Sequence, residues 1–246
     1  MSLRSEPHAL TKALKQQDSQ IHGNVSEPVP KQVPFTWLIV APRGGGKTSL
    51  LLSWLSTVRG YYDTITLFSK TARNDAETKQ SLKSLIEELD EDNKFYTTLT
   101  EENAVEVIER LQDYNDAWKE GKKRRQPRHL VLLDDQLSSL PKGRYKSPIN
   151  DLVVNQRHLK TSLVVLTQAY KSIPTIWRAN AQLVSFFPTA SKKEFTALEE
   201  DLAIEPERLK RVYDYATNEP RSFLHINLFD AAHPIFYRKF DRIVEE

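Results

Sequence analysis

Three glycines, a lysine and a threonine stand together early in the chain, from Gly44 to Thr48. Glycines have no Cβ, so their backbone amides can turn inward around a polyphosphate. The ammonium of Lys47 can then reach the outer phosphates, and the Thr48 hydroxyl can bind Mg²⁺. The predicted nucleotide contacts are Arg43, Gly44, Gly45, Gly46, Lys47, Thr48 and Ser49. This spacing predicts a site for a nucleoside triphosphate with Mg²⁺.

The elements around this loop suit such a site. The apolar residues 37–40 predict a buried strand, and the residues after Lys47 have the apolar spacing of an amphipathic helix. A strand, a glycine-rich loop and a helix are the setting in which a phosphate-binding loop is credible. Ala41 stands where the motif has its first glycine, and alanine can take this place if its φ is negative. The alternative is a chance glycine-rich turn before a helix.

A second group that could do chemistry is a pair of acids, Asp134 and Asp135, which follow the apolar residues 130–133. Such a strand end suits the position opposite a phosphate loop, because the first acid can join the Mg²⁺ shell and the second can polarise an attacking water. We assign these roles to Asp134 and Asp135 in that order. The alternative is a strand that ends in an ordinary hydrophilic turn.

A third candidate is Gln168, which comes just after the apolar residues 163–166. If this strand lies beside the strand of Asp134, the amide of Gln168 faces the γ-phosphate region and can orient the attacking water. Otherwise Gln168 is a surface residue after a strand.

The elements that must hold these residues alternate along the chain. Strands are predicted at residues 37–40, 64–69, 129–133, 163–166, 181–187, 222–228 and 235–240, and helices at 47–58, 77–89, 100–118, from 147, at 192–202 and at 206–215. Strands alternating with helices favour an α/β fold with a mainly parallel central sheet and helices on both faces. We expect the last strand at an edge of the sheet, because its residues are mixed in polarity.

The composition narrows the class of protein. The chain has 246 residues, of which 35 are basic and 33 acidic, and a net charge of +2 excludes a surface that is basic throughout. The absence of cysteine excludes disulfides and thiolate metal sites. No apolar run approaches the roughly 20 residues that span a bilayer. We therefore expect a soluble protein that is not secreted and has no membrane domain.

The two ends of the chain differ in character. Residues 1–33 are polar, are interrupted by prolines and carry few large apolar side chains. Such a segment cannot bury enough surface to offset its ordering entropy, so we expect a flexible arm. Residues 34–246 are then the nucleotide-binding domain.

A basic cluster precedes the strand of Asp134. It consists of Lys122, Lys123, Arg124, Arg125 and Arg128. Beside DNA, these side chains can contact phosphates and add salt-dependent affinity. The alternative is an exposed loop with solvated charges, and both readings stay open.

Together, these motifs resemble the FtsK/HerA branch of P-loop ATPases and are most similar to the poxvirus-type genome-packaging ATPases. The resemblance covers about residues 34–240. The residues that carry it are the run 41–48, the strand ending in Asp134-Asp135, Arg157-His158, Thr167-Gln168 and the run 176–181.

The resemblance implies a RecA-like P-loop ATPase domain over residues 34–246. It implies a homo-oligomeric ring, a hexamer or a pentamer, that hydrolyses ATP between subunits and packages double-stranded DNA into a capsid. Capsid proteins are then partners, and the site of action is the host cytoplasm or the virion. It also implies an arginine finger that acts in a neighbouring subunit, with Arg157 as first choice and Arg178 as second. Asp135 departs from the glutamate that the family often has there.

Three other functions stay open from the sequence. A P-loop kinase could pass phosphate to a small molecule, although no arginine-rich lid follows the core strands. Another ring ATPase, such as a secretion or plasmid-transfer motor, would share the loop and the acids. A nucleotide-gated scaffold would bind ATP and recruit partners without turnover. ATP turnover stimulated by duplex DNA separates the motor from the kinase and the scaffold.

Overall fold

The structure is a computed structural model that describes residues 25–70, 93–136 and 147–245. The helix expected at residues 77–89 and most of the expected N-terminal arm lie outside the described residues.

The described residues form one nine-stranded sheet in the order β3-β2-β4-β5-β1-β6-β7-β8-β9. The strands are β1 Thr36–Val40, β2 Thr64–Ser69, β3 Lys94–Tyr96, β4 His129–Asp134, β5 Thr161–Thr167, β6 Leu183–Phe186, β7 Leu224–Asn227, β8 Ile235–Arg238 and β9 Asp241–Arg242. From β3 to β6 all neighbours are parallel, and from β6 to β9 they are antiparallel. The expected mainly parallel sheet is therefore confirmed.

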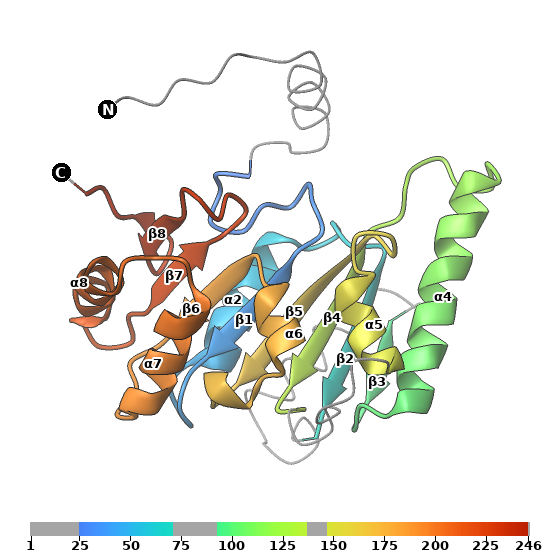
Figure 1. Cartoon of the computed structure of the whole chain (residues 1–246). Helices are drawn as coiled ribbons and strands as arrows, with labels where there is room; N and C mark the ends of the chain where they lie inside the picture. Colours follow the sequence, from blue (N-terminus) through green and yellow to red (C-terminus); the bar gives the residue numbers. More distant parts are fainter. Residues whose placement is uncertain (1–24, 71–92, 137–146, 246) are drawn as a thin grey trace, which may run out of the picture.

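Helices cover both faces of this sheet, as the sequence predicts (Figure 1). The helices are α2 Lys47–Thr57, α4 Glu101–Lys119, α5 Pro148–Val154, α6 Thr175–Ala179, α7 Lys192–Asp201 and α8 Pro206–Thr217, with a 3-10 turn at Tyr170–Ser172. Side chains alternate along β1, so that Trp37 and Ile39 pack in the core beneath α2, whereas Leu38 and Val40 face the core that the later helices cover. The sheet therefore has an apolar core on each of its faces.

Two helix starts follow from their capping residues. Thr100 Oγ1 accepts a hydrogen bond from Asn103 N at 3.2 Å and caps α4. Ser147 Oγ accepts from Ile149 N at 3.2 Å and caps α5, whose first residue is Pro148. Each cap satisfies an amide that has no partner inside the helix. Both predicted starts are confirmed.

Residues 25–28 lie against the antiparallel end of the sheet. Asn227 Nδ2 donates to the carbonyl oxygens of Val25 and Glu27 at 2.8 and 2.9 Å, and the Tyr237 hydroxyl donates to Ser26 O at 2.7 Å. The ring of His225 contacts Pro28 O at 2.7 Å. These side chains fix the path by which the chain enters β1, while the expected boundary between arm and domain near residue 34 stays a prediction.

The edges of the sheet differ from the expectation. The strand predicted at residues 235–240 is not at an edge, because β9 pairs with it beyond the turn at Lys239, whose φ is 55°. At the other edge, β3 lies between the helices predicted at residues 77–89 and 100–118, where no strand was predicted. Both edge strands have only two or three residues, too few to show an alternation of polarity.

Candidate nucleotide-binding site

Three parallel strands bring the predicted site residues to one edge of the sheet. Strand β5 lies between β4 and β1, and all three end at the lower edge in Figure 1. Ala41 N donates to Thr167 O at 3.0 Å, and Asp135 N donates to Leu166 O at 3.2 Å. The glycine loop and the acid pair therefore flank the end of β5, two strand spacings or about 10 Å apart.

The glycine-rich loop requires its glycines for different reasons. Gly44 and Gly46 have φ of 74° and 103°, in the left-handed region that other residues rarely adopt. At Gly45, an added Cβ would lie 3.0 Å from both Ala41 Cβ and Pro42 O. Ala41 itself is buried and is not among the residues with positive φ. The condition under which alanine fits the first position of the motif is thus met.

The start of α2 faces this loop with uncapped amides. Its N-cap is Gly46, which has no side chain to accept a hydrogen bond, and the first turn contains no acid. The first helical hydrogen bond runs from Leu50 N to Gly46 O at 2.9 Å. The amides before Leu50 and the positive end of the helix dipole therefore suit an anion.

Lys47 is the buried cation of the loop. Its Nζ donates to Ala41 O at 2.9 Å and to Pro42 O at 3.4 Å, so the ammonium turns back over the loop that precedes it. A phosphate in the loop would compete with these carbonyls for the same donors. The contact between Lys47 and the outer phosphates that the motif predicts stays a prediction.

Asp134 ends β4 as a buried carboxylate, and its Oδ2 accepts a hydrogen bond from Ser69 Oγ at 2.7 Å. Ser69 ends the neighbouring strand β2 directly opposite Asp134. The next residue, Asp135, has a φ of 51°, which aspartate tolerates better than most residues but which still marks a strained turn. Strain of this kind gathers at functional sites, and it turns the second acid out of the strand.

A buried amide, Gln136, ties the acid pair to the start of α4. Its Oε1 accepts from Leu99 N at 2.9 Å, and its Nε2 donates to Asp134 O at 3.1 Å. Neither Ser69 nor Gln136 was expected from the sequence. Ser69 could have been found by the reasoning used for Gln168, since it too is a polar residue at a strand end, whereas no motif points to Gln136.

Thr48 and Asp134 offer the oxygen atoms that Mg²⁺ prefers. Beside a nucleotide, Mg²⁺ takes only one or two protein oxygens, and phosphates and water supply the rest. The described residues contain no group of three or more His, Cys, Asp or Glu side chains that could hold a metal ion alone. The two oxygens fit the ion in its usual setting beside phosphates.

The remaining predicted residues are placed differently. Gln168 is exposed at the end of β5, and β5 lies beside the strand of Asp134, which is the condition for its predicted role. Arg157 is exposed in the turn before β5, at the opposite edge of the sheet. Arg178 binds Asp201 in an ion pair, donates to Thr175 and has only 14% of its side chain exposed. The structure therefore gathers Lys47, the acid pair and Gln168, and leaves Arg157 at the far edge.

No helix among the described residues has both the length and the apolar character needed to cross a membrane.

Comparisons with known structures identify the fold. The chain is similar to the genome packaging NTPase B204 from Sulfolobus turreted icosahedral virus 2 in complex with AMP, with a TM-score of 0.62, 13% identity, and 85% of this chain and 98% of that chain covered. For B204 in complex with ATP-gammaS the TM-score is 0.57, with 14% identity and coverage of 84% and 98%. For Thermomonospora curvata EccC (ATPases 2 and 3) it is 0.51, with 8% identity and coverage of 86% and 37%. At these identities, the likeness shows the fold alone, a P-loop NTPase fold.

Sequence comparison identifies the family. A search of curated proteins finds no match. Residues 29–214, well over half of the chain, match the family described as Poxvirus A32 protein. The resemblance to poxvirus-type ATPases predicted from the motifs is thereby confirmed, and the chain belongs to the poxvirus A32 family.

Proposed function

We propose that this protein is an ATPase that assembles as a homo-oligomeric ring and uses ATP·Mg²⁺ to move double-stranded DNA into a capsid. The observation that carries the proposal is the placement of the glycine loop and the acid pair on the two sides of β5. Family membership supports it, as does the fold shared with B204, whose structures are described as a packaging NTPase with bound nucleotides. Capsid proteins are the implied partners, in the host cytoplasm or the virion.

The residues of the site divide the work of hydrolysis. The amides at the start of α2 and the ammonium of Lys47 hold the phosphates and offset their charge. Thr48 and Asp134 hold Mg²⁺, which neutralises charge that develops on the phosphates. Asp135 polarises the attacking water, and Gln168 orients it from the strand between. A glutamate would reach one methylene further than Asp135, so we expect hydrolysis with a modest rate constant.

An arginine from a neighbouring subunit completes the site. Arg157 precedes β5 and the glycine loop lies beyond the other end of that strand, so the seven residues of β5 separate them by about 20 Å. Arg157 therefore cannot serve the pocket of its own subunit. In a ring with head-to-tail contacts it can serve the next one. Arg178 is the weaker candidate because Asp201 already binds it.

The test of the proposal is ATP turnover with and without duplex DNA. Stimulation by duplex is expected for the parent protein. Lys47→Ala should lose ATP binding or turnover, whereas Asp135→Asn should keep ATP·Mg²⁺ binding and lose turnover. Asparagine also tolerates positive φ, so this variant should fold normally. Parental turnover by Asp135→Asn would remove Asp135 from the role of base. Turnover indifferent to duplex would favour the kinase, and ATP binding without turnover would favour the scaffold.

Mixing two inactive variants tests the arginine in trans. Arg157→Ala subunits keep an intact pocket, and Lys47→Ala subunits keep the arginine. Each alone should turn over ATP little, because a trans arginine contributes about 10³- to 10⁵-fold in rate. The mixture should regain part of the duplex-stimulated turnover. Full activity of Arg157→Ala alone would eliminate this residue and move the test to Arg178.

A further inference from the structure

Three loops meet at the edge of the sheet opposite the nucleotide site. Residues 58–63, 120–128 and 155–160 precede the neighbouring strands β2, β4 and β5. Backbone hydrogen bonds join them, from Asp63 N to Arg128 O at 2.8 Å and from His129 N to Lys160 O at 3.1 Å. We call these three loops the amino-edge surface. It is one connected surface at the amino ends of these strands.

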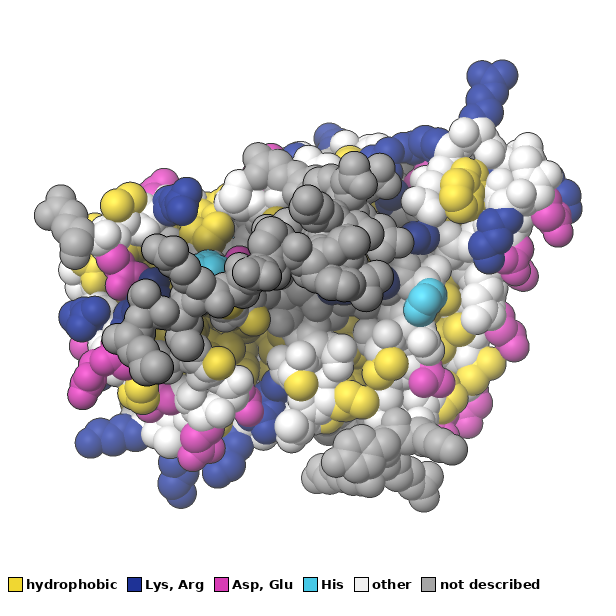
Figure 2. Space-filling view, turned by 45° about the horizontal axis from the view of Figure 1, so that its top comes forward, with side chains coloured by type: hydrophobic (Ala, Val, Ile, Leu, Met, Phe, Trp, Pro, Cys, Tyr) yellow, Lys and Arg dark blue, Asp and Glu magenta, His cyan; other side chains and the backbone are white. Residues whose placement is uncertain are grey.

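The amino-edge surface concentrates positive charge. Its basic residues are Arg59, Lys122, Lys123, Arg124, Arg125, Arg128, Arg157 and Lys160, and its acids are Asp63 and Glu120. Eight basic and two acidic residues give a net charge of +6, although the whole chain carries only +2. The rest of the chain is therefore net negative. Figure 2 shows Lys and Arg side chains gathered along the edge that comes forward beyond the end of α4.

The two acids hold the surface in shape more than they neutralise it. Asp63 uses both carboxylate oxygens, one for Arg125 Nη2 at 2.8 Å and the other for Arg128 N at 2.9 Å. Glu120 pairs with Lys122 in an exposed ion pair at 2.5 Å, and such pairs open readily. Five of the eight cations have side chains that form no ion pair with these two acids, namely Lys123, Arg124, Arg128, Arg157 and Lys160.

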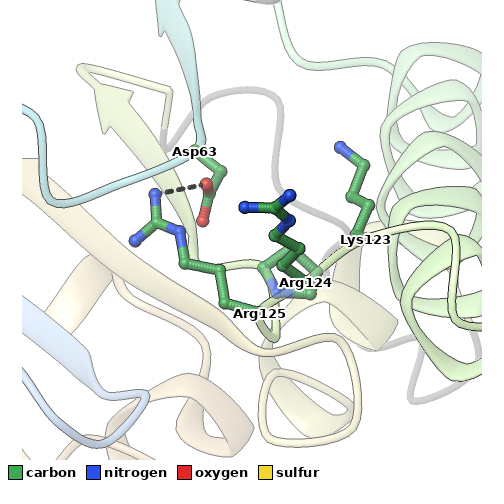
Figure 3. Close-up of a pocket in the computed structure, with 5 residues that line it drawn as sticks. Asp63, Lys123, Arg124 and Arg125 are labelled. Atoms are coloured by element: carbon green, nitrogen blue, oxygen red, sulfur yellow. Dashed lines mark hydrogen bonds and ion pairs between the residues drawn. The ribbon is translucent and has the colours of Figure 1, made fainter.

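Aromatic rings position two cations without neutralising them. The Lys123 ammonium lies 3.8 Å from the centroid of the Tyr114 ring, and the Arg128 guanidinium lies 4.2 Å from that of Tyr61. A cation on a ring keeps its full charge and other N–H donors. Arg124 forms no ion pair or hydrogen bond with any other residue that the structure describes, and its guanidinium lies between Asp63 and Lys123 (Figure 3).

The shape of the surface indicates an extended ligand. Lys123, Arg124 and Arg125 line an open hollow of about 500 Å³ with Asp63 and Pro127, and the other cations lie outside it on all three loops. A single phosphate would need two or three donors converging in an enclosed site. Cations spread over a surface instead match a polyanion, and duplex DNA presents about one negative charge per 1.7 Å of its axis.

We propose that the amino-edge surface binds the phosphate backbone of duplex DNA, on the edge of the sheet opposite the nucleotide. The inference rests on the proposed function, which supplies the duplex, and adds where the duplex lies. Nucleotide and DNA then do not compete for space in one subunit. Because these contacts reach phosphates and not base edges, binding is independent of sequence.

The test uses a double variant, Lys123→Gln with Arg124→Gln, which leaves the ion pair of Asp63 with Arg125 in place. Its matched control is Lys210→Gln with Arg211→Gln, exposed residues of α8 beyond the other end of the sheet, with the same change in charge. Duplex binding is measured by fluorescence anisotropy over a range of salt concentrations. Each lost phosphate contact reduces the slope of log K against log salt by about 0.9.

For the variant, we expect the magnitude of this slope to fall by about 2, with weaker binding of every duplex sequence and unchanged ATP turnover without DNA. The control should keep the parental slope. A parental slope in the variant would overturn the proposal that the amino-edge surface binds DNA. The proposed function would still stand if duplex DNA stimulated ATP turnover by the parent protein. An equal loss in the control would also overturn the proposal for the amino-edge surface, because it would show a general charge effect. Tighter binding of poly-glutamate than of duplex, lost in the variant, would reassign the surface to an acidic protein partner.

Discussion

The phosphate loop makes a sharp prediction at Gly45. Its φ is not positive, so alanine is excluded there by space and not by backbone conformation. The added Cβ would lie 3.0 Å from Ala41 Cβ and 3.0 Å from Pro42 O. Neither atom belongs to a flexible side chain that could move away. The loop must therefore open by a few tenths of an ångström for Gly45→Ala to fold.

Overpacking of this kind costs about 1–3 kcal/mol. Because the strain falls on the phosphate-binding loop, we expect this free energy to appear as weaker ATP binding. The affinity of Gly45→Ala for ATP should be about 5- to 150-fold lower than that of the parent. Ala41→Gly would remove one of the three crowding atoms and leave Pro42 O at 3.0 Å and Pro42 Cδ at 3.3 Å. The pair Ala41→Gly with Gly45→Ala should therefore recover part of the lost affinity, and the two changes should couple.

Equilibrium binding of a fluorescent ATP analogue measures all four members of this cycle. Gly44→Ala is a useful comparison, because its added Cβ meets nothing within 4 Å although its φ of 74° penalises alanine. That variant should show no coupling to Ala41→Gly. Equal affinities for the parent and Gly45→Ala, or an additive double variant, would refute the predicted crowding of Gly45 against Ala41.

Three further substitutions test buried polar residues that stabilise the fold or contact Asp134. Burial lowers the pKa of His225 from 6.5 to about 4. Between these two pH values the unfolded chain binds a proton on this histidine and the folded chain does not, so the free energy of unfolding falls by about 3 kcal/mol as the pH drops from 6.5 to about 4. In urea unfolding, the free energy of unfolding of His225→Gln should fall less on acidification than that of the parent. The control His158→Gln, at an exposed position, should show the same fall as the parent. Gln136→Ala leaves the buried amide of Leu99 without its acceptor and should lower the free energy of unfolding by about 1–3 kcal/mol, measured by urea titration. Ser69→Ala removes the donor to Asp134 and should raise the Mg²⁺ concentration for half-maximal ATP turnover about tenfold.

Much of the sheet is predictable because local patterns suffice for it. The β-branched and aromatic residues of Thr64–Ser69 form a strand with the predicted bounds. Thr100 and Ser147 cap helices as expected because the capping hydrogen bond needs only residues two or three positions away. The role of Gln168 depends on β5 lying beside β4, a condition that the structure meets.

What the sequence could not predict depends on register and on the third dimension. Ser69 meets Asp134 only because β2 pairs with β4 in a register that places both at strand ends. Gln136 bonds to a residue 37 positions earlier, which no local pattern records. The basic residues 59, 157 and 160 join the cluster around Arg124 through strand order, although they are dispersed in sequence.

The position of Arg157 makes the two proposals constrain one another. A finger in trans needs the amino edge of one subunit to approach the nucleotide edge of the next, which buries part of the amino edge in a subunit interface. Residues buried there cannot also contact DNA. The surface must then be divided, with the turn before β5 facing the neighbour and the loop before β4 open to the duplex. Arg157→Ala should accordingly lose ATP turnover and keep the parental salt slope of DNA binding. Lys123→Gln with Arg124→Gln should keep ATP turnover without DNA and show a smaller salt slope. If Arg157→Ala instead showed a smaller salt slope and kept its ATP turnover without DNA, Arg157 would be a DNA contact. The arginine finger would then be another residue.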